Sequence, residues 1–204
     1  MLISWNTTQA CNISCLHCYR DAGDCLRDEL TTEEGKRLLD DAFACGFRIF
    51  VFSGGEPLLR PDLLELIAYA RSIGLRPVLG TNGILLTPQK VAELKQAGLA
   101  AAGISVDSVS PERHDWFRQS VGAWAATVEG MRVCRAAGLP FQVHTTVMDW
   151  NEAEVLAITD KAIEWGAAAH HIFFLVPTGR GDNIKDRSLP VEQQETLLSN
   201  ILEK

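Results

Sequence analysis

Residues 46–57 read GFRIFVFSGGEP. This stretch begins with a glycine that ends a helix, continues as a strand and finishes with the glycine-rich segment that follows the strand. Gly46 suits the left-handed position just past a helix. FRIFVFS is apolar on both faces, as the strands of buried parallel sheets are. The same order of helical stretch, glycine and β-rich run recurs further along the chain, at Gly74, Gly98, Gly138 and Gly166.

Helix starts are marked by capping signals and by proline at the first helical position. These signals are Thr31 with Glu34, Asn151 with Glu154, Thr87 with Pro88, and Ser110 with Pro111. In the helix that begins at about Pro61, one apolar stripe is formed by Leu63, Leu66, Ile67 and Ala70. The last helix runs from about Pro190 to the end of the chain.

Together with LISWNTT at residues 2–8, these runs give six strand–helix units. Alternation of strands and helices predicts an α/β fold with a parallel sheet and right-handed crossovers. The pattern fits an open doubly wound sheet or a partial barrel. No linker rich in Pro, Gly or Ser interrupts it, so we expect one domain over residues 1–204.

The chain has 204 residues, 47% hydrophobic and 22% charged, enough for a sizeable core. A formal net charge of -7 argues against nucleic-acid or bilayer partners, because their phosphates would repel it. No apolar run approaches the ~20 residues of a membrane span. The start, MLISWNTTQ, lacks the segments of an export signal. We therefore expect a cytoplasmic protein with reduced cysteines.

Polar or glycine-rich segments follow each predicted strand. They are CNISCLHCY (11–19), SGGEP (53–57), TNG (81–83), SVDS (105–108), HTTVMD (144–149) and PTGRG (177–181). Each alone has the composition of an ordinary turn. In both candidate architectures the carboxyl ends of the strands carry the active site, so the set together predicts a site at this rim.

The first of these segments holds Cys11, Cys15 and Cys18. An iron–sulfur cube usually takes four thiolates, so three leave one iron free to bind a small molecule. Zinc is the main alternative, and it requires a fourth ligand, for which His17 is the candidate. Ligation by His17 and its neighbour Cys18 to one tetrahedral ion is awkward, which favours the cube.

CxxxCxxC after a first strand and GGEP after a second resemble the radical S-adenosylmethionine (SAM) superfamily, over essentially the whole chain. The resemblance implies a partial (β/α)6 TIM barrel, a 4Fe–4S cluster held by the three cysteines, and SAM bound at the vacant iron through its methionine amine and carboxylate. It also implies reductive cleavage of SAM to a 5′-deoxyadenosyl radical that takes hydrogen from a substrate. The protein's part is to position this cofactor pair.

The resemblance assigns the methionine end of SAM to the GGEP segment. Gly54 and Gly55 are expected to let the backbone approach the amine, and Glu56 to accept a hydrogen bond from it. The alternative for Glu56 is a charge favoured at a helix N-terminus. Pro57 is expected to stiffen the turn.

The ribose is assigned to Ser105, Asp107 and Asn82, although Asn82 also suits an ordinary turn. HDWFR, residues 114–118, matches a stretch whose arginine reaches the SAM carboxylate, which makes Arg118 the candidate. A surface position is its alternative.

For the adenine, relatives use residues that flank the last cysteine, here His17 and Tyr19. Val176, after the sixth strand, is expected to pack on the other adenine face.

Some residues depart from the pattern or lie outside it. Ser108 and Gln119 replace glycines of the usual SLDG and FRG. Cys45 and Cys134 are expected to be small core residues. Cys25 lies in a polar loop and is a candidate reactive thiol.

GGEPLLRPDL, TNG, HDWFR and HIFFLVPTGRG together resemble the branch that trims side chains of siroheme-derived tetrapyrroles. The resemblance implies removal of an acetate or propionate group, a tetrapyrrole or other small-molecule substrate, and a low-potential electron donor. Arg180 is a candidate for pairing with substrate carboxylates. Of His170 and His171, one could face the cavity, but a packed or solvent-facing role is favoured.

Relatives in this branch carry a cysteine-rich C-terminal extension with auxiliary clusters, and no second cysteine cluster follows here. We expect a core-only protein or a fragment of a longer one. In either case a partner, an oligomer contact, a further domain or a large substrate must cover the open side of the barrel.

Two other functions remain as alternatives. A radical SAM peptide maturase needs a peptide-recognition region, for which the chain leaves little room. A non-catalytic iron–sulfur electron carrier or scaffold has no need of a GGEP segment.

Overall fold

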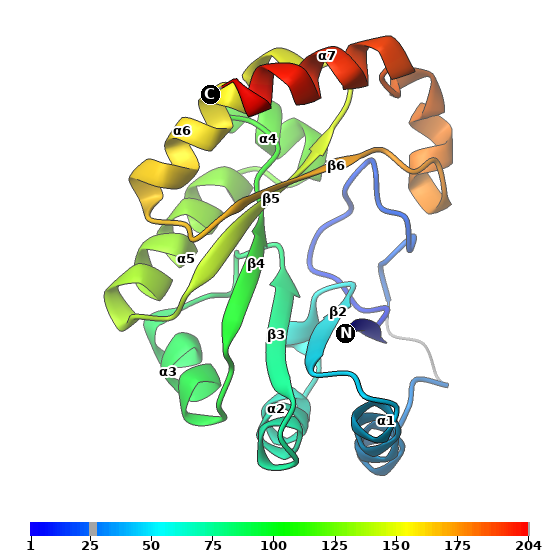
Figure 1. Cartoon of the computed structure of the whole chain (residues 1–204), viewed down its shortest axis with the longest axis vertical. Coiled ribbons are helices and arrows are strands. Elements are labelled where there is room, and N and C mark those ends of the chain that lie inside the picture. Colours follow the sequence, from blue (N-terminus) through cyan, green and yellow to red (C-terminus); the bar gives the residue numbers. More distant parts are fainter. Residues whose placement is uncertain (25–27, 204) are drawn as a thin grey trace.

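A computed structural model describes residues 1–24 and 28–203, and it shows a curved sheet with helices along its outer face (Figure 1). The strands are β1 (Leu2–Thr8), β2 (Ile49–Gly54), β3 (Arg76–Thr81), β4 (Ala101–Ser105), β5 (Phe141–Val147) and β6 (His170–Phe174). The α-helices are α1 (Thr32–Ala44), α2 (Leu63–Ser72), α3 (Pro88–Gln96), α4 (Pro111–Arg118), α5 (Ala123–Ala137), α6 (Val155–Trp165) and α7 (Val191–Leu202). Short 3-10 helices are η1 (Pro57–Leu59), η2 (Glu152–Glu154) and η3 (Gly179–Arg187).

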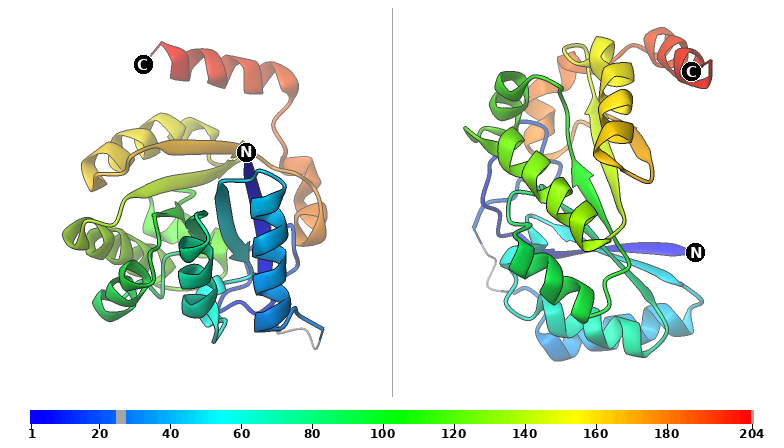
Figure 2. Two further views of the ribbon diagram at one scale, coloured as in Figure 1. Left: turned by 60° about the horizontal axis from the view of Figure 1, so that its bottom comes forward. Right: turned by 90° about the vertical axis from the view of Figure 1, so that its left-hand side faces the viewer.

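The sheet is parallel throughout, and its strands follow the order of the chain from β1 to β6. Within the described residues the two outermost strands each pair with one neighbour only, so the sheet curves without closing (Figure 2). A doubly wound sheet would instead change direction in its strand order. The predicted partial barrel is therefore confirmed.

Most of the predicted helix starts are present. The Thr31–Glu34 capping box forms, and the hydroxyls of Thr87 and Ser110 accept hydrogen bonds from the third helical amide. The predicted cap at Asn151 is wrong. Its side chain is buried and closes the turn after β5, accepting from the amide of Met148 (2.8 Å) and donating to the carbonyl of Asp107 (2.9 Å).

Glycine ends the helices as the sequence predicts. Positive φ angles of 65° to 94° occur at Gly46, Gly74, Gly98, Gly138 and Gly166. The end of α4 differs, because Gln119 holds the left-handed position with a φ of 54°. The left-handed backbone conformation is unfavourable for a residue that has a side chain, so this position is strained.

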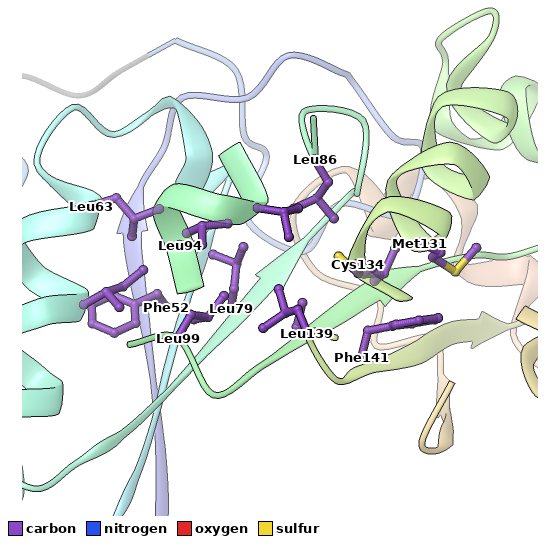
Figure 3. Packing of buried hydrophobic residues seen from close by; sticks show 14 of the residues in the cluster. Phe52, Leu63, Leu79, Leu86, Leu94, Leu99, Met131, Cys134, Leu139 and Phe141 are labelled. Atoms are coloured by element: carbon purple, nitrogen blue, oxygen red, sulfur yellow. The ribbon is translucent and has the colours of Figure 1, made fainter. Parts of the chain in front are cut away.

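The main core lies between the sheet and the helices of its outer face. Figure 3 shows Phe52 of β2, Leu79 of β3 and Leu94 of α3 packed together in this layer. Cys134 of α5 is fully buried there, as predicted. The same prediction for Cys45 is wrong, because Cys45 caps the end of α1 and is exposed. Cys25 lies outside the described residues.

The concave face of the sheet is much less covered than the outer face. Along β5, buried residues alternate with half-exposed ones such as Gln142 and His144. On β6, Phe173 is 49% exposed. The strands were expected to be buried on both faces, but only the outer face has helices to cover it.

Helices α6 and α7 cover the last strand. Val155, Leu189 and Leu197 form a small core with Ile172 and Phe174 of β6. Among the described residues, none of the helices has the length and apolar character needed to cross a bilayer.

Candidate active site

A cavity opens at the carboxyl ends of the strands, and each of the six segments singled out in the sequence contributes to its wall. The wall residues include Cys11, Cys15, Cys18, Ser53, Gly55, Asn82, Ser105, His144 and Arg180. The structure therefore brings distant polar segments together at one rim, where the parallel strands end.

The loop after β1 presents its three thiols to this cavity. Cys15 is buried, and Cys11 and Cys18 are half-buried. The amide of Cys18 donates to the carbonyl of Cys15 (3.3 Å), and the amide of Leu16 donates to the carbonyl of Phe117 in α4 (3.0 Å). Burial raises the pKa of the Cys11 and Cys15 thiols. Metal ligation has the opposite effect, because the thiolate is the ligand.

The arrangement of the thiols fits a cluster better than a single ion. Among residues 1–24 and 28–203, no three His, Cys, Asp or Glu side chains are grouped closely enough to hold one ion. A cube places each thiolate on a different iron, so its ligands need not converge on one point. His17, the candidate fourth zinc ligand, instead stacks on Phe117, with ring centroids 4.4 Å apart.

Arg118, at the end of α4, is held as a buried cation beside Cys15. Its Nε donates to Asp107 Oδ2 (2.7 Å), and its Nη1 lies 3.7 Å from Cys15 Sγ. Burial acts to lower the pKa of Arg118, but Asp107 and Cys15 outweigh burial and raise it. A fixed cation at the cavity wall suits the predicted contact with a ligand carboxylate.

Asp107 lies behind Arg118 instead of lining the cavity. It is fully buried, and its Oδ1 accepts from the amide of Thr146 (3.0 Å). Burial acts to raise the pKa of Asp107, and the Arg118 guanidinium overcomes this and holds it below the usual range. In this structure Asp107 holds the guanidinium of Arg118, and its expected contact with ribose stays a prediction.

Glu56 is also placed behind the wall. The carboxylate is fully buried and accepts hydrogen bonds from Thr81 Oγ1 (2.8 Å), the amide of Asn82 (3.0 Å) and the amide of Leu58 (3.1 Å). Burial raises the pKa of Glu56 to about 7, against the lowering effect of these bonds. These bonds link the ends of β2 and β3, and the expected contact of Glu56 with the SAM ammonium stays a prediction.

Gly54 and Gly55 line the cavity, and their expected approach to the SAM amine stays a prediction. A Cβ on Gly54 would lie 2.5 Å from the carbonyl oxygen of Thr8, and one on Gly55 would lie 2.2 Å from that of Ala10. The glycines therefore let the loop after β1 touch the end of β2. Pro57 is buried at the first position of η1, as a stiff turn requires.

Asn82 and Ser105 both lie on the cavity wall. The side-chain Nδ2 of Asn82 donates to Asn12 Oδ1 (2.8 Å), so Asn82 also ties the cysteine loop to the end of β3. Ser105 is half-buried at the end of β4. Of the expected ribose contacts, these two have access to a ligand.

Two of the three residues expected near adenine, His17 and Tyr19, line the cavity as well. Burial, more than the nearby Arg118, lowers the pKa of His17 to about 3, so its ring is neutral. Tyr19 is 53% exposed, and its hydroxyl donates to Asn6 Oδ1 (2.7 Å). One face of His17 is occupied by a ring of α4, which leaves the other for a ligand.

The chain after β6 differs from expectation in two ways. Val176 is 64% exposed and is not part of the cavity wall, whereas its neighbour Leu175 is buried. Arg180 lines the cavity, but its guanidinium is bound to the cysteine loop and the residues that follow it. Its Nε donates to the carbonyl of Cys15 (2.9 Å), and its Nη1 donates to the carbonyl of Ala22 (2.7 Å) and to Asp21 Oδ1 (2.9 Å).

The start of η3 lies directly on the cysteine loop, as the orange and blue segments of Figure 1 show. The amide of Arg180 donates to the carbonyl of Cys18 (2.9 Å), and a Cβ on Gly179 would lie 2.6 Å from that oxygen. This contact fixes the loop from the side opposite α4.

A family model described as "Radical SAM superfamily" matches residues 5–162, which include the cysteine loop, GGEP and the Arg118 helix. The chain belongs to the radical SAM superfamily. This superfamily uses a 4Fe–4S cluster and SAM. Cys11, Cys15 and Cys18 are the residues in the cavity that would hold the cluster.

Two curated relatives from Methanosarcina barkeri are similar over nearly the whole chain. An AdoMet-dependent heme synthase is 44% identical over 197 residues, which are 96% of this chain and 56% of that protein. An Fe-coproporphyrin III synthase is 38% identical over 204 residues, 100% of this chain and 51% of that protein. The chain thus spans about half the length of the curated relatives it matches.

A solved structure has the same fold. Streptococcus suis SuiB bound to its precursor peptide SuiA superposes with a TM-score of 0.84, over 99% of this chain and 45% of that one. The sequences are 14% identical, so the similarity concerns the fold alone.

The two departures from the superfamily pattern have local explanations. Gln119 takes the left-handed position at the end of α4 that favours glycine. Ser108 is buried and has partners of its own, since its hydroxyl donates to Glu154 Oε2 (2.5 Å) and accepts from the amide of Ser110 (3.0 Å).

Sequence reasoning missed His144 as a wall residue, although it lies in one of the singled-out segments. The alternation of side chains between the two faces of a strand is the signal that could have found it. His144 lies two residues after Gln142, so both occupy the concave face of β5. For His170 and His171, a packed or solvent-facing role was the favoured prediction. His170 is packed between Thr145 and Thr159, and His171 is exposed on the concave face.

Proposed function

We propose that residues 1–204 are the core domain of a radical SAM enzyme that removes acetate or propionate groups from a siroheme-derived tetrapyrrole in haem biosynthesis. The 44% identity to an AdoMet-dependent heme synthase carries this proposal. Three thiols and a buried cation at one cavity wall support the reaction class.

When bound, the cluster and SAM supply a 5′-deoxyadenosyl radical that takes hydrogen from a substrate carbon. The contribution of this chain is positional. Arg118 offers a fixed cation for the methionine carboxylate, and Ser105 and Asn82 offer polar groups on the same wall. His17 offers a neutral ring face. For a propionate, the balanced outcome is loss of one hydrogen atom, CO2 and one electron to an acceptor, which leaves a vinyl group.

The concave face is the space for the substrate. It continues from the cavity over half-exposed and exposed residues of β5 and β6. A flat tetrapyrrole has the extent and apolar faces to lie against it. The same proposal includes a low-potential electron donor and a cytoplasmic location. It also includes a partner, a further domain, an oligomer contact or a large substrate that covers the open side of the barrel.

Anaerobic reconstitution with iron and sulfide, followed by dithionite and SAM, tests the class. We expect 5′-deoxyadenosine and methionine in equal amounts. Protein that holds iron and sulfide but yields neither is an electron carrier or scaffold, and that result contradicts the proposal.

Substrate class is tested by adding Fe-coproporphyrin III or didecarboxysiroheme to the reconstituted protein, with unrelated peptides as the matched comparison. We expect tight binding of at least one tetrapyrrole, faster 5′-deoxyadenosine formation and a side-chain-shortened product. Stimulation by peptides but not by tetrapyrroles identifies a peptide maturase instead.

A further inference from the structure

His144 lies on the concave face, where the cavity meets the open part of the sheet. It pairs in register with Ser105 of β4 on one side and with His171 of β6 on the other. Its carbonyl accepts from the amide of Val106 (2.9 Å), which fixes its backbone beside Ser105. A ligand held by Ser105 is therefore next to His144.

The imidazole of His144 lies over Gly103 of β4, in space that a side chain at residue 103 would fill. A Cβ on Gly103 of β4 would lie 2.4 Å from Cε1 and 2.8 Å from Nε2 of His144. On the other side, the rings of His171 and Phe173 lie 5.2 Å and 5.4 Å from the His144 ring, centroid to centroid. The glycine and the two rings hold the imidazole across the sheet.

This well-held ring lacks a hydrogen-bond partner. Nε2 of His144 is buried and has none among the described residues. His170 provides the contrast, because its two ring nitrogens lie 2.8 Å from Thr145 Oγ1 and 2.9 Å from Thr159 Oγ1. A buried polar atom without a partner is unfavourable, so Nε2 of His144 has hydrogen-bonding capacity for a ligand group or a bound water.

The charged groups of the wall do not compete for this task. The guanidinium groups of Arg118 and Arg180 are both engaged, with Asp107 and with the cysteine loop. Burial, followed by His171 and His170, lowers the pKa of His144 to about 4, so the ring is neutral near pH 7. A neutral imidazole carries no fixed charge, and it donates through Nε2 in the tautomer with the proton on that nitrogen.

We propose that His144 binds the carboxylate of the substrate side chain from which hydrogen is removed. This inference rests on the proposed function, and it names the residue that recognises the reacting group. His144 lies beside Ser105, on the SAM side of the substrate space, and the reacting side chain must reach that point.

A neutral donor suits a carboxyl group that leaves as CO2. A fixed cation would stabilise the charged carboxylate more than the neutral product and would oppose its loss. A neutral imidazole orients the same carboxylate through a hydrogen bond. Its interaction with the carboxylate depends less on the negative charge than that of a cation does.

The test compares two probes of one shape, Fe-coproporphyrin III and its tetramethyl ester, which lacks free carboxylates. Affinities of the reconstituted wild type, His144→Phe and His144→Gln are measured by absorption titration. We expect His144→Phe to bind the acid about tenfold more weakly, the loss of one hydrogen bond to a charged group, and the ester with unchanged affinity. His144→Gln, which keeps a donor, is expected to recover part of the loss.

Glu129→Gln is the control, because Glu129 is exposed on α5, on the helix-covered side of the sheet and away from the concave face. Its preference for acid over ester should equal that of the wild type. If His144→Phe does not fold, as judged by circular dichroism, His144→Gln and the wild type still measure this preference. An equal preference in every His144 variant and in the wild type overturns the inference.

Two further outcomes are distinguishable. If the variants lose affinity for both iron porphyrins equally, with a changed Soret band, and bind metal-free coproporphyrin III normally, His144 is an iron ligand and the inference is wrong. If the wild type binds neither porphyrin, the proposed function fails and this inference falls with it.

Discussion

Two sides of one cavity are built differently. The cysteine wall, which we define as the loop with Cys11, Cys15 and Cys18 together with Arg118 and Arg180, is tied down from several directions. The histidine wall, defined as Gly103, Ser105 and His144, has a ring fixed in place with its Nε2 unpartnered within the part of the chain that the structure describes.

The difference indicates a division of labour. Groups that hold a cofactor in one geometry benefit from partners that fix them before binding. Groups that recognise a substrate must keep hydrogen-bonding capacity free for it. Changes in the cysteine wall should therefore affect SAM chemistry and stability, and changes in the histidine wall should affect substrate preference.

The largest expected effect is that of Cys15→Ala. Removal of one of three cluster ligands should lower 5′-deoxyadenosine formation about 100-fold or more and reduce bound iron and sulfide. Product analysis and iron determination measure it. Cys45→Ser is the matched control, because Cys45 is exposed at the end of α1, and it should behave as the wild type. An unchanged yield from Cys15→Ala means that the ligand assignment is wrong.

Asp107→Asn tests whether the cysteine wall depends on its buried ion pair. Without a charged partner, Arg118 becomes an uncompensated buried cation, which should lower the free energy of unfolding by about 3 kcal/mol. SAM binding should weaken as well, because Arg118 loses its anchor. Urea unfolding and SAM titration measure the two effects.

Glu129→Gln is the control for that experiment, since it breaks the exposed Arg132–Glu129 pair on α5. It should leave stability nearly unchanged. Normal SAM affinity in Asp107→Asn would show that the pair does not position Arg118.

Glu56, which links the ends of β2 and β3, should make the stability of the protein depend on pH. Its pKa is raised from 4.5 to about 7 in the folded protein, so between these values the folded state holds a proton that the unfolded state has released. The resulting stabilisation is fully present below pH 4.5 and declines as pH rises to 7, by at most about 3 kcal/mol. Glu56→Gln cannot titrate and should lose this decline.

Urea unfolding at several pH values between 5 and 8 measures the difference between wild type and Glu56→Gln. Glu65→Gln, on the surface of α2, is the matched control and should follow the wild-type profile. Parallel profiles for wild type and Glu56→Gln would show that Glu56 is ionised across this range.

The sequence was sufficient for the fold and for the place of the site. Helix-ending glycines, capping residues and β-rich runs are local signals, and they located every strand. Cysteine spacing and strand-end composition then located the cavity, because parallel strands present their carboxyl ends to one rim.

The sequence did not reveal the direction of individual side chains. Asp107 and Glu56 lie just past strand ends, where the alternation of faces along a strand no longer applies, and both are fully buried and not part of the cavity wall. His144 lies within a strand, where alternation does apply, but its orientation depends on Gly103 of a neighbouring strand. Such contacts between distant segments become visible only in three dimensions.

The smallest expected effect concerns Gln119, next to Arg118. Its left-handed backbone (φ 54°) is unfavourable for a side chain, so Gln119→Gly should raise the free energy of unfolding by about 0.5 to 1 kcal/mol. Gly122→Ala is the mirror control. Gly122 has a φ of 82° and open space around a Cβ, so alanine should destabilise through the backbone alone. If the Arg118–Asp107 pair fixes the cysteine wall, SAM affinity stays constant in Gln119→Gly while stability rises. A changed affinity would instead show that the backbone at Gln119 helps to position Arg118.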